Sequence, residues 1–237
     1  MRFCQQFVLL VTLMLIATAY SVAHIVDSET GLNFQYNAKF TEVTPVVDGF
    51  LDDPAWEEVE LGKMEQDLIK NAHWNGSSDF KGEFAAVWRN GFLYLAVKLT
   101  DDSLETRQTK LSRQDHLVIY IDPNHSGHKS DLYRSVVPVG KSVPLANSPL
   151  TMVAWGDNGQ SCELSFNLGH IAKKGESIGF SIYYNDVDGG QVNHKIAWGP
   201  EGYADQDNFL PDLVFTAAIK RNENQKVTQW ARIKKLY

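Results

Sequence analysis

The stretch FAAVWRNGFLYLAVKLT, residues Phe84–Thr100, decides the fold. Two apolar runs flank Asn90-Gly91, a dipeptide that accepts the positive φ angles of a type I′ turn. Beyond this turn, every second residue from Leu93 to Leu99 is leucine or valine. A period of two places these side chains on one face of a strand. The stretch therefore predicts a β-hairpin with a strongly apolar face.

A second stretch, QDHLVIYID at Gln114–Asp122, predicts another strand. Leucine or isoleucine at positions 117, 119 and 121 occupies one face. The other face is mixed and runs from His116 through Tyr120 to Asp122. A strand that is apolar on one side only suits a sheet with one face in a core and the other turned toward a cleft.

Turns rich in Gly, Asn, Asp and Pro separate the other segments with strand-like alternation. These segments are Leu132–Val139, Leu150–Trp155, Ser161–Phe166, Ile178–Asp186, His194–Trp198 and Asp212–Ile219. Helical patterns are rare. A short helix is expected at Pro54–Val59, where Asp53 precedes a proline at the first helical position. Gly62–Asp79 is polar and predicts a loop. The whole pattern predicts an all-β sandwich in a single domain, with a short N-terminal helix.

The N-terminus has the features of a secretory signal peptide. Arg2 precedes an apolar run at Phe7–Ala19, and the small-x-small sequence Ser21-Val22-Ala23 follows. We expect cleavage after Ala23, with Ala19 as the second choice, and a secreted or periplasmic protein. The run is shorter than the ~20 apolar residues of a membrane span, and an uncleaved anchor is the alternative. The predicted divisions are 1–23 signal peptide, 24–39 lead-in segment, 40–219 β domain and 220–237 basic tail with a possible edge strand.

Charge and cysteine content exclude several classes of protein. The chain of 237 residues has 22 basic and 29 acidic side chains. Loss of Arg2 with the signal changes the net charge from −7 to −8. An acidic surface does not favour nucleic acid, whose binding needs cationic groups against phosphates, and no membrane partner is expected after cleavage. Cys162 is the one cysteine outside the signal, so no intramolecular disulfide is expected and a buried, inert thiol is the simplest state.

Several motifs together resemble the family 9 carbohydrate-binding modules. In chain order they are Val47-Asp48-Gly49-Phe50-Leu51-Asp52-Asp53-Pro54-Ala55-Trp56, Phe92-Leu93-Tyr94-Leu95 through Asp101-Asp102, Gln114-Asp115 through Tyr120-Ile121-Asp122, Ile178-Gly179-Phe180 through Asn185-Asp186, and Trp198. The resemblance spans about residues 40–219. It implies a β-sandwich of two antiparallel sheets, a cleft for sugars and bound calcium. The physical basis is that a sugar ring offers an apolar C–H face to aromatic rings and hydroxyls to polar groups.

The resemblance also implies the site residues. The cleft arginine of the family corresponds to Arg134, and Gln114 is a second hydrogen-bonding candidate. Tyr183 stands where the family has a glutamine. The expected ring faces come from Tyr183, Tyr203 and Trp155. This chain departs from the family at Ser112, where the family has a clamp aromatic, and at Val118, where the family has an acidic residue.

Calcium binding is a further expectation from the resemblance. Asp122, Asp186 and Asp188 lie at strand ends, and carboxylate oxygens on loops suit Ca²⁺. The alternative is that these residues are turn aspartates that bond their own backbone.

The expected function is a non-catalytic carbohydrate-binding protein, and three alternatives stay open. The protein could serve glycoside hydrolysis or carbohydrate catabolism as an accessory, but hydrolysis itself needs two facing carboxylates, and Glu163 on its strand has no evident partner. It could bind haem as related β-sandwich domains do, although only Met64 and Met152 are methionines outside the signal. It could also be an adhesive or assembly module.

Overall fold

A computed structural model describes residues 34–69, 76–126, 129–142, 149–198 and 210–218. The predicted signal peptide, the predicted basic tail and Tyr203 lie outside these ranges. Within them, the regular structure consists of strands and single 3₁₀ turns, and no helix is long and apolar enough to cross a membrane. The strands are β1 Gln35–Phe40, β2 Gly62–Met64, β3 Gln66–Asp67, β4 Phe80–Arg89, β5 Phe92–Asp101, β6 His116–Asp122, β7 Tyr133–Pro138, β8 Leu150–Trp155, β9 Ser161–Asn167, β10 Ser177–Asp188, β11 Gln191–Trp198 and β12 Asp212–Thr216.

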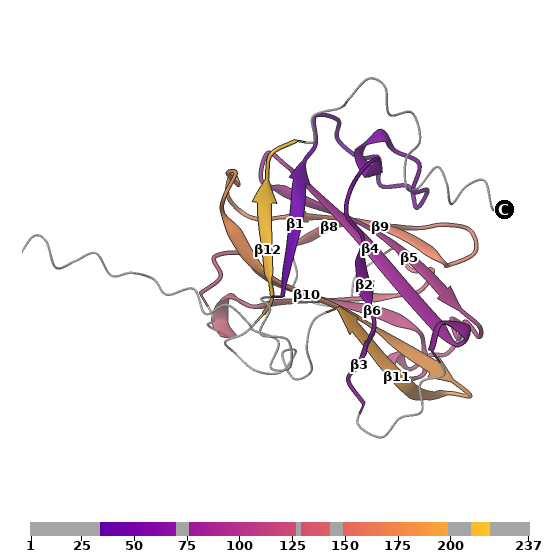
Figure 1. Ribbon diagram of the computed structural model, residues 1–237. Helices are drawn as coiled ribbons and strands as arrows, with labels where there is room; N and C mark the ends of the chain where they lie inside the picture. Colours follow the sequence, from indigo (N-terminus) through magenta and orange to yellow (C-terminus); the bar gives the residue numbers. More distant parts are fainter. Residues whose placement is uncertain (1–33, 70–75, 127–128, 143–148, 199–209, 219–237) are drawn as a thin grey trace, which may run out of the picture.

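The strands form the predicted all-β sandwich, with two layers joined along one edge (Figure 1). One layer has the order β7-β6-β10-β11-β3 and the other has the order β8-β9-β5-β4-β2. Pairing within each layer is antiparallel. The layers are connected by β12, which pairs with β10, and β1, which pairs in parallel with both β12 and β4.

The predicted hairpin is confirmed as β4 and β5. Asn90 and Gly91 have φ angles of 49° and 83°, as a type I′ turn requires. Gly91 also packs tightly, because a Cβ atom there would lie 2.3 Å from the carbonyl oxygen of His170.

The prediction of an N-terminal helix is wrong. Pro54–Trp56 forms only one 3₁₀ turn, and the backbone becomes extended again at Glu57. The Asp53 carboxylate does not cap this turn, and instead accepts a bond from the backbone N–H of Val46 at 2.7 Å. The turn is fixed by tertiary contact: the Trp56 indole N–H donates to Glu163 on β9 at 2.7 Å. A buried partner far along the chain has overridden the local helix signal.

Two other segments contain strands that the sequence analysis did not predict. Strand β1 begins in segment 24–39, which was expected to be a lead-in, and ends at Phe40. Its sequence QYNAKF alternates polar and apolar residues, and Tyr36 and Ala38 are buried, so the strand signal was present. Strands β2 and β3 lie within the polar segment Gly62–Asp79 and have three and two residues. Strands this short carry too few residues for a visible period.

The main core lies between the layers, and each layer contributes one face of alternating side chains. Cys162 is fully buried in it, as predicted. A smaller apolar cluster lies outside β4 and β5, under the turn at Trp56. Glu163 is buried there and also accepts bonds from the backbone N–H groups of Asp48 and Gly49, both at 3.0 Å.

Candidate functional site

At one end of the core, the inward faces of several strands change from apolar to charged. On β5 the inward residue after Leu99 is Asp101, and on β10 the inward residue after Tyr184 is Asp186. His194 lies opposite Asp186 on β11. Side chains two residues apart lie on the same face of a strand. The alternation that places apolar side chains in the core therefore also places these polar groups at the end of the core.

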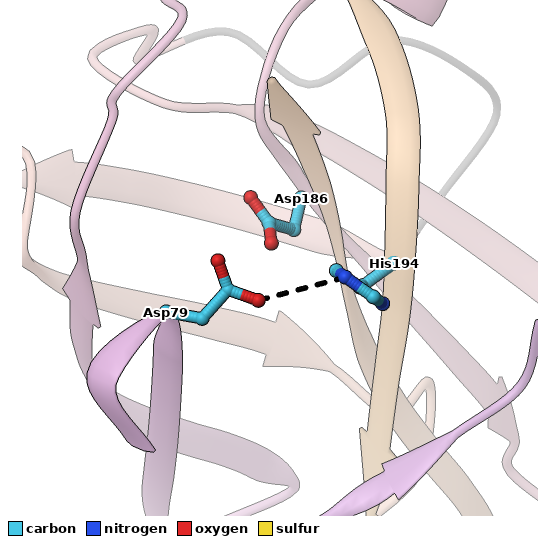
Figure 2. A group of neighbouring side chains, drawn as sticks. All are labelled: Asp79, Asp186 and His194. Carbon is cyan, nitrogen blue, oxygen red and sulfur yellow. Dashed lines mark ion pairs between the residues drawn. The ribbon is translucent and has the colours of Figure 1, made fainter. Parts of the chain in front are cut away.

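These residues belong to an acidic cluster made of Asp79, Asp101, Asp102, Asp115, Asp186, Asp188 and His194. Three groups within it have donor atoms that all lie within 4.8 Å of one another. The first is Asp101, Asp115 and Asp186; the second is Asp79, Asp102 and Asp188; the third is Asp79, Asp186 and His194 (Figure 2). Asp79 is in the turn before β4, and Asp115 directly precedes β6.

Part of the cluster is held by hydrogen bonds. Tyr184 stacks on Phe80 with ring centroids 4.5 Å apart, and its hydroxyl donates to Asp101 at 2.6 Å. Asp115 accepts bonds from the backbone N–H groups of Val187 at 2.8 Å and Glu105 at 2.5 Å. These bonds fix the directions in which two carboxylates face the cluster.

Other oxygen atoms of the cluster are buried without such bonds. In the described part of the chain, no hydrogen-bond partner is present for Oδ2 of Asp186 or for Oδ1 of Asp188. Asp186 is only 2% exposed. A buried carboxylate oxygen without a partner is costly, so this arrangement points to a ligand that the oxygen atoms receive together.

The electrostatics favour a cation. Burial, followed by repulsion from Asp101 and Asp188, raises the pKa of Asp186 to about 8. Burial also raises the pKa of Asp115 to about 7, although the hydrogen bond from the backbone N–H of Glu105 acts to lower this pKa. Hard oxygen donors brought together in this way fit calcium, which takes 6–8 oxygen ligands. The first two groups of the cluster supply carboxylates only, so this donor set is compatible with the calcium that the family resemblance implies.

The structure places two of the three residues expected to bind metal, Asp186 and Asp188, in the acidic cluster. Asp122 lies elsewhere, because it pairs with Gly179, seven residues back along β10 from Asp186, which corresponds to about 23 Å of strand. Sequence reasoning missed the other five members, Asp79, Asp101, Asp102, Asp115 and His194. The signal for Asp101 and Asp115 was available: each continues the inward period of an apolar strand.

A second polar site lies on the outer face of the layer that contains β6, β7 and β10. Arg134 on β7 is exposed and lies opposite Tyr120 on β6. Its Nε donates to the Tyr120 hydroxyl at 3.1 Å, and its guanidinium carbon lies 6.0 Å from that ring's centroid. Arg134 also hydrogen-bonds the side chain of Tyr183. The two tyrosine rings stack at 6.2 Å.

The other residues expected to bind sugar are placed differently. Gln114 is buried at the end of the 3₁₀ turn Leu111–Arg113, before β6 begins, and its side-chain amide donates to the carbonyl of Gln108. Trp155 lies on β8, in the opposite layer, and is partly buried against the main core. Tyr203 lies outside the described residues. Arg134 and Tyr183 are thus the two members that the structure brings together.

Comparisons with known proteins agree with this fold. The family profile described as "Carbohydrate family 9 binding domain-like" matches residues 47–209. A search of curated protein sequences found no significant match.

Two similar solved structures are of a family 9 carbohydrate binding module from Caldicellulosiruptor kristjanssonii. One is in complex with cellotriose, with 18% identity, and the other is in complex with glucose, with 17% identity. Both have a TM-score of 0.66 and cover 81% of this chain, and 97% and 100% of their own chains respectively. At these identities the likeness shows a shared fold.

Proposed function

Because this chain belongs to the carbohydrate family 9 binding domain-like family, we propose that it is a non-catalytic carbohydrate-binding protein that contacts its sugar through Arg134. The ligand would lie on the outer face of β6, β7 and β10. The similar module from Caldicellulosiruptor kristjanssonii is in complex with cellotriose and with glucose, which supports a carbohydrate as the ligand class.

The observation that carries this proposal is the presentation of the Arg134 guanidinium. The side chain is exposed, yet two phenol oxygens hold it in place. A guanidinium has five N–H donors in one plane, and the bonds to Tyr120 and Tyr183 use only part of this capacity. A positioned planar donor suits vicinal hydroxyls, which present two acceptor oxygens side by side.

The tyrosines have a supporting role in this proposal. Tyr120 and Tyr183 are 5% and 6% exposed, so their ring faces are not open to a sugar in the way that a clamp requires. Burial raises the pKa of Tyr183 to about 12, which keeps its phenol neutral and able to bond Arg134. The contact would therefore be mainly polar, with Arg134 as its centre.

We further propose that the protein is exported, on the strength of the signal sequence at residues 1–23. We also propose that the acidic cluster binds structural calcium through Asp101, Asp115 and Asp186, whose carboxylate oxygens lie within 4.8 Å of one another, with Asp188 of the neighbouring group as a further ligand because its Oδ1 is buried without a hydrogen-bond partner in the described residues. The calcium would offset part of the negative charge of the cluster and hold the ends of β5, β6 and β10 together.

Binding to a panel of soluble polysaccharides and oligosaccharides, followed by affinity electrophoresis and calorimetry, tests the sugar proposal. The Arg134→Ala variant should bind about 10–100-fold more weakly, since a hydrogen bond from a charged donor contributes about 1.5–3 kcal/mol. Lys174→Ala, which removes an exposed cation on a loop, is the matched control and should bind normally.

Two results would contradict the proposal. Equal binding by Arg134→Ala and wild type would place the ligand elsewhere, and no binding to any member of the panel would remove the carbohydrate function. A reducing-sugar assay on the same panel should show no hydrolysis. Formation of new reducing ends would favour the enzymatic alternative, glycoside hydrolysis.

A further inference from the structure

The third group of the acidic cluster differs from the other two because it contains a histidine. Asp79, Asp186 and His194 come from a turn, from β10 and from β11, and their side chains point toward one another (Figure 2). The side chains of Asp79 and His194 are only 10% and 8% exposed. Nε2 of His194 lies 3.5 Å from Oδ2 of Asp79.

His194 is held in one orientation from its other side. Its Nδ1 lies 2.9 Å from Oδ2 of Asp67 on β3, at the edge of the same layer. A histidine whose Nδ1–H donates to a carboxylate presents the lone pair of Nε2 on the opposite side of its ring. This carboxylate–histidine arrangement is the usual support of a metal-bound imidazole, where it fixes the tautomer and raises the basicity of the ligand.

Asp186 is the third residue of this group, with a carboxylate oxygen within 4.8 Å of the donor atoms of Asp79 and His194. Asp186 is 2% exposed, and no hydrogen-bond partner for its Oδ2 is present in the described ranges. Asp186 and His194 are direct neighbours across β10 and β11. The strand pairing itself therefore brings this carboxylate to the imidazole.

The distance between two of the three ligand atoms fits a tetrahedral metal. Zinc takes imidazole nitrogen and carboxylate oxygen at about 2.0–2.2 Å, so two ligands at the tetrahedral angle lie about 3.4 Å apart. The distance from His194 Nε2 to Asp79 Oδ2 is 3.5 Å. Calcium prefers oxygen ligands throughout, whereas imidazole suits zinc and its neighbours in the first transition row.

We infer that His194, Asp79 and Asp186 form a site for a zinc-class divalent ion, with Asp67 as the residue that orients His194. Three protein ligands leave one tetrahedral position for water. The site shares Asp186 with the proposed calcium site but uses a different donor set. It is on the inward side of β10 and is independent of the sugar proposal at Arg134.

The test is calorimetric titration of the metal-stripped full chain with zinc alone and with calcium alone, together with thermal unfolding. Zinc should bind at one equivalent and raise Tm. His194→Gln should weaken zinc binding at least 100-fold and leave calcium binding within about 3-fold of wild type. Asp67→Asn should weaken zinc binding about 10–100-fold. His170→Gln, whose side chain is 45% exposed in a loop, is the matched control and should bind zinc as wild type does.

A second measurement covers the case in which His194→Gln does not fold. The ¹⁵N spectrum of the wild-type histidines should show one ring shifting on zinc addition, through its ε2 nitrogen. The competing arrangement is an imidazolium paired with both Asp67 and Asp79. No stoichiometric zinc binding, equal zinc binding in His194→Gln, or zinc signals at other histidines would overturn the inference.

Discussion

Replacement of Asp186 by asparagine should have opposite effects on stability with and without calcium. The substitution keeps the shape of the side chain and removes its negative charge. In the metal-free protein this charge lies within 4.8 Å of the carboxylates of Asp101 and Asp115. With calcium bound, the same charge becomes a ligand, so the sign of its contribution changes.

The magnitudes follow from the distances and from mass action. At separations of no more than 4.8 Å, repulsion between two full charges is at least about 3.5 kcal/mol at an effective dielectric constant of about 20. Partial protonation reduces this value, so we expect Asp186→Asn to gain about 1 kcal/mol in excess EDTA. Calcium at 100 times its Kd should stabilise the wild type by about 2.7 kcal/mol. At about 2–4 °C per kcal/mol for a chain of this size, Tm should rise by about 5–11 °C.

The assay is thermal unfolding of wild type and Asp186→Asn in EDTA and in a calcium series. The variant should melt about 2–4 °C above the wild type in EDTA and below it in saturating calcium. Asp157→Asn, which changes an exposed turn aspartate, should leave both melting temperatures unchanged. An equal loss of stability in both conditions would show that Asp186 acts only as a structural acceptor. A wild-type Tm that does not change with calcium concentration would contradict the calcium proposal.

Two other predictions concern the charge balance of the fold. Burial raises the pKa of Asp115 to about 7 and of Asp186 to about 8. The folded state therefore holds protons that the unfolded state releases near pH 4. In EDTA, the stability that these protons provide should be lost progressively as pH rises from about 4 to about 8, between the unfolded and folded pKa values, so melting curves should show Tm falling from about pH 5 to about pH 8 and levelling off above; a flat profile would contradict this. Glu163→Ala leaves two backbone N–H groups and the Trp56 indole without their acceptor, each costing about 1–3 kcal/mol. Urea unfolding should show a loss of at least about 3 kcal/mol, against less than about 0.5 kcal/mol for the exposed control Glu65→Ala; a similar small loss for both would show that Glu163 does not fix the N-terminal turn.

Local pattern was sufficient for most of the sandwich. Strand alternation is written into neighbouring residues, and the Asn90-Gly91 turn depends on the φ angles of two residues alone. The strands β4 to β12 could therefore be predicted within a few residues, and Arg134 could be matched to the family. Local pattern was misleading at Pro54–Trp56, because the helix signal there was local while the contact that decided the structure, Trp56 to Glu163, spans 107 residues.

The sequence by itself determined that the chain forms two apolar-faced layers, that it resembles sugar-binding modules, and that Asp186 and Asp188 stand at the end of a strand. Only the tertiary structure decided that Asp79, Asp186 and His194 meet, and that Asp122 lies apart from them. The physical reason is register. A period of two shows which face of a strand a residue occupies, but the residues that share one end of the core depend on which strands pair and at what offset, and those pairings join positions that are distant in the chain.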